Sequence, residues 1–228
     1  MAQIQSGASA DLLTVDPTSK AARVTLYDST GREIMPKATG AYCLGFQVRH
    51  TTAAAAAVTV FNMRGPPSLT AYVKRIIGTM GFDGTALAAS GTLRYGFFRG
   101  SGPANASGGG ANVSPAATAG KKRASYGNLT LNNFTYDQNG TGLTTTGITY
   151  ETQQFAIVTL PVVSLQVAAP TTSATSGPVV PYEINFAMEG TLDQAFELGA
   201  NEHIGIQLLT VSAIIGLTIS GRFEWDER

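Results

Sequence analysis

The chain has 228 residues, of which 43% are apolar and 13% are charged. This length and apolar content allow a packed core and exclude an intrinsically disordered chain. Fifteen basic residues balance fifteen acidic ones, so the chain as a whole has no electrostatic attraction to nucleic acid or to an anionic membrane. Zero net charge favours association, and we therefore expect this protein to work inside an assembly.

Cys43 is the only cysteine, which excludes an intrachain disulfide and a cysteine-based metal cluster. The first residues have neither a basic start nor an apolar stretch, so we expect no secretory signal peptide. No apolar run reaches the roughly 18 residues of a membrane-spanning helix. We therefore expect a protein made in a reducing cytoplasm, with no membrane partner.

Residues 1–38 are expected to form a separate arm and hairpin with a docking role. Met1–Ala22 is polar and rich in small residues, and such a segment needs a partner to become ordered. Arg23–Tyr27 and Arg32–Met35 are strand-like and flank a turn that ends in Gly31. This pattern is typical of a β-hairpin.

The remaining residues, 39–228, are expected to form one β-sandwich domain. In the last segment, Leu217–Asp226, apolar and polar residues alternate, with Trp225 on the inward row and Glu224 on the outward row. Period-two alternation indicates a half-buried strand, and many short strands between Gly and Asn turns indicate a sandwich or a barrel. Further strands are expected at Tyr42–His50, Val58–Met63, Thr70–Thr79, Thr92–Arg99, Asn128–Tyr136, Phe155–Val167, Tyr182–Met188 and Ile204–Leu209.

The connections between these strands differ in length and composition. Gly100–Arg123 is a long glycine-rich loop, and loops of this length are usually functional or mobile. It ends in the only basic run, Lys121-Lys122-Arg123, for which a solvated loop end is favoured over contact with a phosphate or an acidic neighbour. Ala53–Ala57 is expected to be a connection, and Thr191–Leu198 could form a short helical turn.

Few residues suggest catalysis or metal binding. His50 and His203 have no acidic residue or cysteine at metal-ligand spacing, so we expect ordinary surface or edge residues. Asp137–Gly142 matches the first half of a calcium loop, but Ile148 stands where a bidentate Glu is needed. Because Asn-Gly is a strong turn signal, a plain turn is favoured there. We predict no enzyme activity, no metal and no cofactor.

The segment Leu160–Val167 is unusually apolar for a strand beside a loop. Two interpretations are open, a strand buried on both faces and a subunit interface. Under the second interpretation, the closed symmetry of a homotrimer would protect this surface. The expected trimer-interface residues are Leu160, Val162, Val163, Leu165 and Val167.

Three parts of the chain resemble structural proteins of tailed-bacteriophage virions. The opening, Ala10–Gly31, resembles their N-terminal segment. The ending, Glu197–Leu208 and then Leu217–Glu227 with its Trp-Asp-Glu tail, is similar to the last strands of trimeric jelly-roll, TNF-like phage proteins. Leu93–Pro103, together with the glycines at Gly108–Gly110, looks like their mid-domain strand and glycine-rich loop.

The resemblance implies an all-β fold, a jelly-roll (TNF-like) antiparallel β-sandwich, and a virion protein assembled in the host cytoplasm. The first expectation is a capsid decoration (cement) protein that stabilises the head as a homotrimer on the major capsid protein or other virion proteins. The alternatives are a head or tail fibre that binds a host receptor and, less favoured, a carbohydrate-binding or carbohydrate-active sandwich that contacts a host-surface glycan. The expected docking residues are Leu12, Leu13, Val15, Val24 and Leu26.

Overall fold

The computed structural model divides the chain into two units, Met1–Lys37 and Ala38–Arg228. In the first unit, β1 (Thr14–Val15) pairs antiparallel with β2 (Ala22–Arg23). The expected hairpin of residues 23–35 lies outside the described residues, except for Arg23, which pairs with Thr14. The structure describes residues 14–15, 22–23, 40–51, 58–86, 91–108, 110–112, 120–122, 126–162, 179–186, 196–209 and 215–228.

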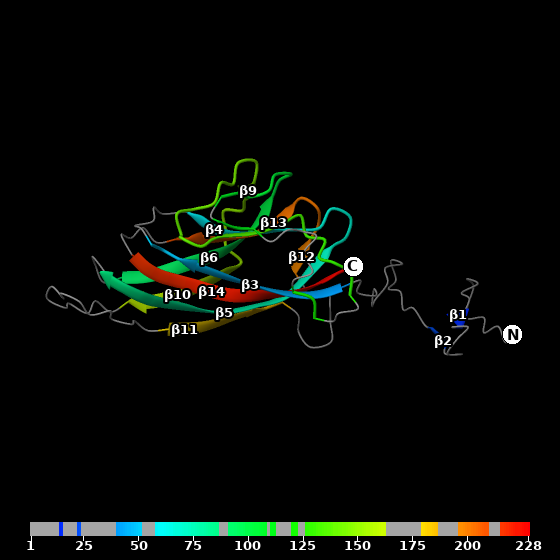
Figure 1. Cartoon of the computed structure of the whole chain (residues 1–228), viewed down its shortest axis with the longest axis horizontal. Helices are drawn as coiled ribbons and strands as arrows, with labels where there is room; N and C mark the ends of the chain where they lie inside the picture. Colours follow the sequence, from blue (N-terminus) through cyan, green and yellow to red (C-terminus); the bar gives the residue numbers. More distant parts are fainter. Residues whose placement is uncertain are drawn as a thin grey trace. The chain divides into compact units, whose positions relative to one another are not determined.

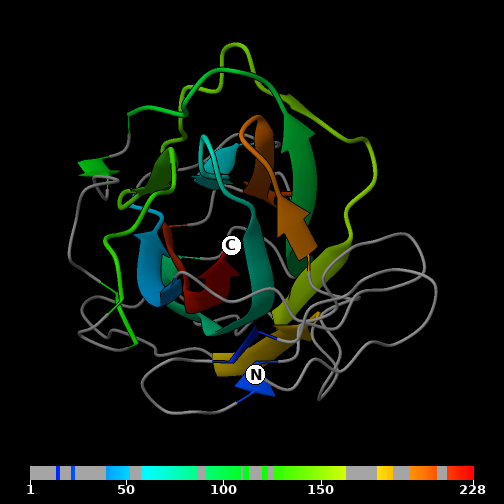
Figure 2. The ribbon, with the colours of Figure 1, turned by 90° about the vertical axis from the view of Figure 1, so that its right-hand side faces the viewer.

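The second unit confirms the predicted all-β sandwich: two antiparallel sheets pack face to face (Figures 1 and 2). The seven-stranded sheet has the order β10-β6-β13-β4-β8-β7, with β9 paired to β6. Its strands are β4 (Thr59–Arg64), β6 (Gly91–Ser101), β7 (Gly110–Asn112), β8 (Asn133–Asp137), β9 (Thr149–Tyr150), β10 (Ala156–Val162) and β13 (Glu202–Leu208).

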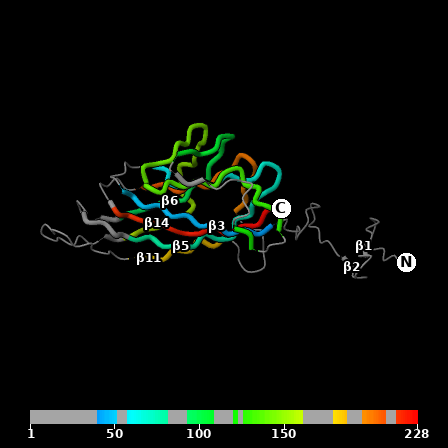
Figure 3. Tube along the Cα trace, in the orientation of Figure 1, coloured from blue at the N-terminus to red at the C-terminus, as the bar shows by residue number. Residues whose placement is uncertain are grey.

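The five-stranded sheet has the order β11-β5-β14-β3, with β12 also paired to β5. The last strand of the chain therefore lies between the first and the third long strands of this unit, and β14 ends where β3 begins (Figure 3). Its strands are β3 (Gly40–Arg49), β5 (Ala71–Ala86), β11 (Val179–Asn185), β12 (Phe196–Leu198) and β14 (Ile215–Glu227).

The eight longest strands pair in a nested way. β3 pairs with β14, β4 with β13, β5 with β11, and β6 with β10. Counted along the chain, the first strand thus pairs with the last and the fourth with the fifth. Each of these pairings joins segments that are far apart in the sequence.

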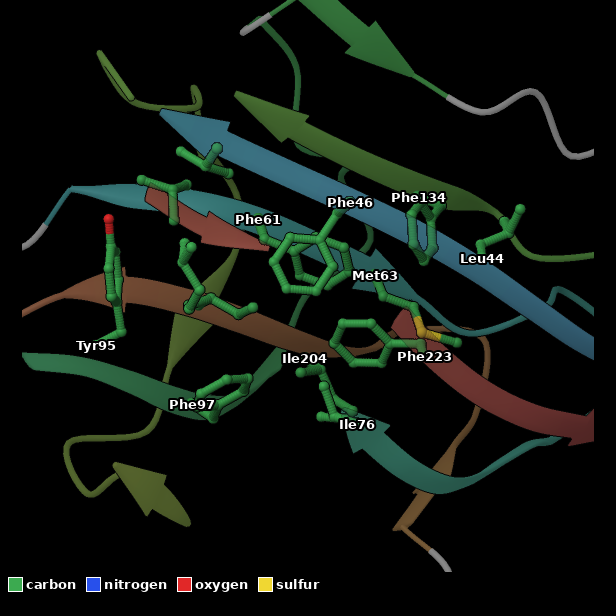
Figure 4. Packing of buried hydrophobic residues seen from close by; sticks show 14 of the residues in the cluster. Leu44, Phe46, Phe61, Met63, Ile76, Tyr95, Phe97, Phe134, Ile204 and Phe223 are labelled. Atoms are coloured by element: carbon green, nitrogen blue, oxygen red, sulfur yellow. The ribbon is translucent and has the colours of Figure 1, made fainter. Parts of the chain in front are cut away.

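Alternating side chains build the core from both sheets. In β3, for example, Tyr42, Leu44, Phe46 and Val48 are buried, whereas the residues between them face outward. Between the sheets, the ring of Phe61 stacks on that of Phe223 at 4.6 Å and meets that of Phe134 edge-on at 5.0 Å (Figure 4). Such aromatic contacts add to the stabilisation that burial of the rings provides.

Two tyrosine rings lie across pairs of glycines on neighbouring strands. Tyr150 covers Gly100 and Gly205, where a Cβ atom on Gly205 would come within 2.7 Å of the Tyr150 Cζ atom. Tyr182 covers Gly78 and Gly221, and its hydroxyl group donates a hydrogen bond to the carbonyl of Ser220 at 3.1 Å. Because a Cβ atom would collide with the ring, these four positions require glycine.

The structure corrects two of the predicted elements. Phe196–Leu198, where we expected a helical turn, forms strand β12 along Ala71–Val73 of β5. The expected loop Gly100–Arg123 contains strand β7 and is anchored by a bridge from Ser107 to Thr144. The alanine run Ala53–Ala57 lies outside the described residues.

Candidate functional site

His203 lies at the centre of a buried hydrogen-bond network in the seven-stranded sheet. The side chain is fully buried, with Nε2 2.9 Å from the carbonyl oxygen of Gly102 and Nδ1 3.2 Å from Asn62 Oδ1. Asn62 Nδ2 in turn donates to the hydroxyl group of Tyr150 at 2.7 Å. Burial lowers the pKa of His203, although the Gly102 carbonyl opposes the shift. This network fastens β13 and β4 to the segment that covers them.

His50 belongs to a different network. Its Nε2 atom lies 2.5 Å from the hydroxyl oxygen of Tyr95, and the two rings stack with their centroids 6.0 Å apart. Burial lowers the pKa of His50, whereas the Gly140 carbonyl and the Asp137 carboxylate raise it by a smaller amount. Both histidines are therefore buried and hydrogen-bonded, and the prediction that they are surface or edge residues is wrong.

Asp137 organises the turn that follows β8. Its Oδ1 atom accepts a hydrogen bond from the backbone N–H of Asn139 at 3.0 Å. Its Oδ2 atom accepts from the hydroxyl group of Thr141 at 3.0 Å and from the backbone N–H of Gly142. Both carboxylate oxygens are thus used within the turn, which is the arrangement that the Asn-Gly signal favours. Within the described ranges, no group of three His, Cys, Asp or Glu residues could hold a metal ion.

The outer face of the five-stranded sheet carries a dense cluster of charges around Glu224. The Glu224 carboxylate contacts Arg75 Nη2 at 3.0 Å, Lys122 Nζ at 2.7 Å and Arg222 Nε at 3.2 Å. Asp226, two residues along β14, contacts Lys74 Nζ at 2.7 Å and is 3.3 Å from Arg228 Nη2. We call these seven residues the Glu224 cluster: Lys74, Arg75, Lys122, Arg222, Glu224, Asp226 and Arg228.

A β-bulge places two successive cations on the same face of this sheet. In the pairing of β5 with β14, Glu224 lies opposite Arg75 and Trp225 lies opposite Val73, so Lys74 is the extra residue. This irregularity explains how Lys74 reaches Asp226 while Arg75 reaches Glu224.

Glu224 remains ionised even though it is buried. Burial by itself would raise its pKa, but hydrogen bonds from Arg75 and Lys122, together with their positive charges, lower the pKa to about 2. The sequence predicted that Glu224 faces outward. It does lie on the outer face, but only 6% of its surface is exposed because the long basic side chains cover it.

Few of the predicted site residues are among those that the structure describes. Leu160 is fully buried and lies opposite Leu93 in the core, so its side chain cannot meet a partner subunit. This finding corrects its assignment to a trimer interface. Val162 and Val15 are described only as parts of β10 and β1. The other predicted interface and docking residues lie outside the described residues: Val163, Leu165, Val167, Leu12, Leu13, Val24 and Leu26.

Sequence reasoning missed both the Glu224 cluster and the exposed apolar residues of the sandwich edge. The residues of the cluster come from three separate segments, and only the alternation of Arg222, Glu224 and Asp226 along the last strand was visible. Ile157 could have been found, because strict alternation from the buried Val158 places it on the outward side of β10.

No protein-family model, no curated protein and no solved structure matches this chain. None of the described residues belongs to a helix with the length and hydropathy that crossing a bilayer requires.

Proposed function

We propose that this chain is a structural protein of a tailed-bacteriophage virion that decorates the capsid as a homotrimer built on a TNF-like jelly roll. The observation that carries the proposal is the nested pairing of the eight longest strands, from β3 with β14 to β6 with β10. A jelly roll folds a long antiparallel ribbon over itself in two Greek keys, and viral capsid domains use this architecture. The resemblance of both chain ends to trimeric phage proteins supplies the role.

Two exposed apolar side chains suited to contacts between copies lie on the outward rows of the edge strands β10 and β11. Among the described side chains, the exposed large apolar ones are Ile157 on β10, 44% exposed, and Val179 on β11, 64% exposed. These strands end their respective sheets on the same side of the sandwich. Both strands contain a proline, Pro161 and Pro181, which has no N–H group to offer an added strand. Copies would therefore meet through side chains and not by extending a sheet.

Attachment to the particle is assigned to the N-terminal unit, Met1–Lys37. The described core residues all belong to the second unit. A decoration protein of this design joins a self-sufficient trimeric body to a separate anchor. Added contacts over the capsid lattice would resist the pressure of the packaged DNA.

The decisive experiment locates the chain in purified virions and tests the anchor. Image reconstruction should show this protein on the head, in a copy number comparable with that of the capsid lattice. A variant that lacks residues 1–22 should keep the melting temperature and oligomeric state of the full chain but fail to bind stripped particles. A small copy number at the tail or at a vertex would contradict decoration and indicate a fibre, and full occupancy by the truncated variant would contradict the anchor.

A further inference from the structure

The two outer faces of the sandwich differ in how they are covered. The segments before and after β9 lie over the seven-stranded sheet, where Tyr150 covers Gly100 and Gly205 (Figure 1). On the five-stranded sheet, the outward residues of β3 and β14 include the exposed Gln47 and Arg222. No described segment lies across this face, except that Lys122 reaches over the edge of β3 to Glu224. Among the described residues, this face is open to a partner.

The charge that this face presents to solvent is positive. The Glu224 cluster contains five cations and two carboxylates, and the carboxylates lie underneath, with side chains only 8% and 6% exposed for Glu224 and Asp226. The side chains of the four cations above them are 35% to 53% exposed: Lys74, Arg75, Lys122 and Arg222. Two exposed acids lie on the neighbouring strands of the same sheet: Glu183 on β11, whose charge also acts on Arg75, and Glu197 on β12, which lies opposite Tyr72. A partner thus meets an excess of cations that fixed carboxylates hold in place.

The buried carboxylates make these cations a prepared binding surface. A free lysine or arginine side chain loses rotamer freedom when it binds an anion, and that loss opposes binding. Here Glu224 and Asp226 already restrain the basic side chains, yet each cation keeps N–H groups free for further bonds. Because the pKa of Glu224 is about 2, this restraint does not change over the physiological pH range.

The dimensions and chemistry of the Glu224 cluster favour protein carboxylates over nucleic acid as its ligand. The cations lie on β5, on β14 and beside β3, which are three neighbouring strands spaced about 4.8 Å apart. This width suits a few clustered Asp or Glu side chains but offers no long track for a phosphate backbone. Tyr72, the aromatic residue nearest to the cluster, lies under the guanidinium of Arg228 at 5.5 Å and is not free to stack on a base.

We propose that the outer face of the five-stranded sheet around Glu224 is an ionic docking surface for the acidic face of a partner protein. The proposal does not depend on the virion role, because it concerns the sandwich alone. It also gives a function to Lys122, which the sequence favoured as part of a solvated loop end.

The test measures binding of fluorescent poly-L-glutamate to the full chain at low ionic strength. One double variant, called the patch variant, carries Arg222→Gln and Lys122→Gln. It removes two cations of the Glu224 cluster, while Arg75 still pairs with Glu224. The matched control, Arg94→Gln with Arg99→Gln, removes two cations from the seven-stranded sheet. We expect the patch variant to bind at least about fivefold more weakly and the control to change less than about twofold, with all binding weakened by salt.

Three further measurements make the outcome unambiguous. Melting curves must show that both double variants are folded, and Arg222→Lys, which keeps the charge, should retain most of the binding. A DNA duplex of equal total charge should bind more weakly than poly-L-glutamate. The proposal is overturned by equal loss in the patch and control variants, by absence of poly-L-glutamate binding at low salt, or by tighter binding of DNA.

Discussion

Trp225 fastens the end of the chain to the core. Its ring is fully buried, stacks on Tyr42 at 5.6 Å, and its indole N–H donates to Glu227 Oε1 at 3.2 Å. We expect Trp225→Ala to lower the free energy of unfolding by about 3–5 kcal/mol or to give insoluble protein, because it leaves a large cavity. Urea unfolding curves measure the change. An unaltered midpoint would instead mean that the ring is an exposed ligand platform.

Glu224 should make stability depend on pH in the acid range. Its pKa falls from 4.5 to about 2 on folding, so ionised Glu224 stabilises the protein above pH 4.5, and this contribution is lost as the pH falls toward 2. At pH 7 we expect Glu224→Gln to lower the free energy of unfolding by about 1–3 kcal/mol, a range that allows for the partial exposure of the cations. The free energy of unfolding, measured from unfolding curves between pH 2 and pH 7, should depend less on pH in the variant than in the wild type.

Glu183→Gln provides the control for that measurement. Glu183 is exposed on β11, and we expect its replacement to change the free energy of unfolding by less than about 0.5 kcal/mol. If the Glu224 and Glu183 variants lost equal stability, or if both kept the acid dependence of the wild type, the assignment of that dependence to the Glu224 cluster would be wrong.

For the last strand, the sequence predicted which way the side chains point but not which residues surround them. Alternation alone placed Trp225 inside and Glu224 outside, and both directions are confirmed. The burial of Glu224 could not be predicted, because its partners Arg75 and Lys122 are more than 100 residues away in the chain. The histidines were misjudged for the same reason, since Tyr95 and Gly102 reach them only through the folded sheets.

At the scale of elements, the turn after β8 ties the two sheets together. Gln138 and Asn139 accept backbone hydrogen bonds from Arg49 and Thr51, at the end of β3. We expect Asp137→Ala to destabilise the fold by about 1–3 kcal/mol, because three donors of this turn lose their acceptor. Amide hydrogen exchange should speed up at Gly142 and Arg49.

Thr141→Val is the graded control. It removes only one of the three hydrogen bonds to Asp137, so it should lower the free energy of unfolding by less than Asp137→Ala does. Calcium chloride should leave the melting temperature of the wild type unchanged, because the Asp137 oxygens are already used within the turn. A rise in melting temperature with calcium would contradict the turn interpretation and restore the calcium loop.

Long alternating strands were predictable as elements, whereas the short ones were not. Tyr42–His50 and Leu217–Asp226 match β3 and β14 closely, because each carries a full period-two pattern. β12 has three residues, too few for any pattern, and exists because β5 offers it an edge. β5 runs on to Ala86, past the expected end at Thr79, because β14 pairs with it there.

At the scale of the whole molecule, the apolar edge predicts the oligomeric state. We expect the wild type to be a trimer in light scattering at micromolar concentration and Ile157→Lys with Val179→Lys to be a monomer, because charges would then enter the apolar contact. Gln47→Lys, on an exposed position of the other edge, should remain trimeric. A monomeric wild type, or a trimer that persists in the double variant, would contradict this interface.

The candidate surfaces were less predictable than the fold. The sequence left Leu160–Val167 open as a strand buried on both faces or as a subunit interface because the segment is unusually apolar, and Leu160 faces the core. Composition cannot separate the two faces of a strand that is mostly apolar, and only the packing of β10 against the second sheet does so. The Glu224 cluster depends on a bulge at Lys74, which is set by the pairing of β5 with β14 and leaves no mark in the sequence.

The nested pairing of the strands has a consequence for how the protein is made. β14 contains the last residues of the chain, yet it is the strand that fills the space between β3 and β5. While the ribosome is still synthesising residues 215–228, β3 and β5 have no partner on their facing edges, and the apolar faces of both sheets lie open. The five-stranded sheet therefore cannot close before residues 215–228 are available, and folding should be slow, since its contacts span almost the full length of the sandwich. Nascent chains of this protein would depend on chaperones to shield those edges until β14 is in place.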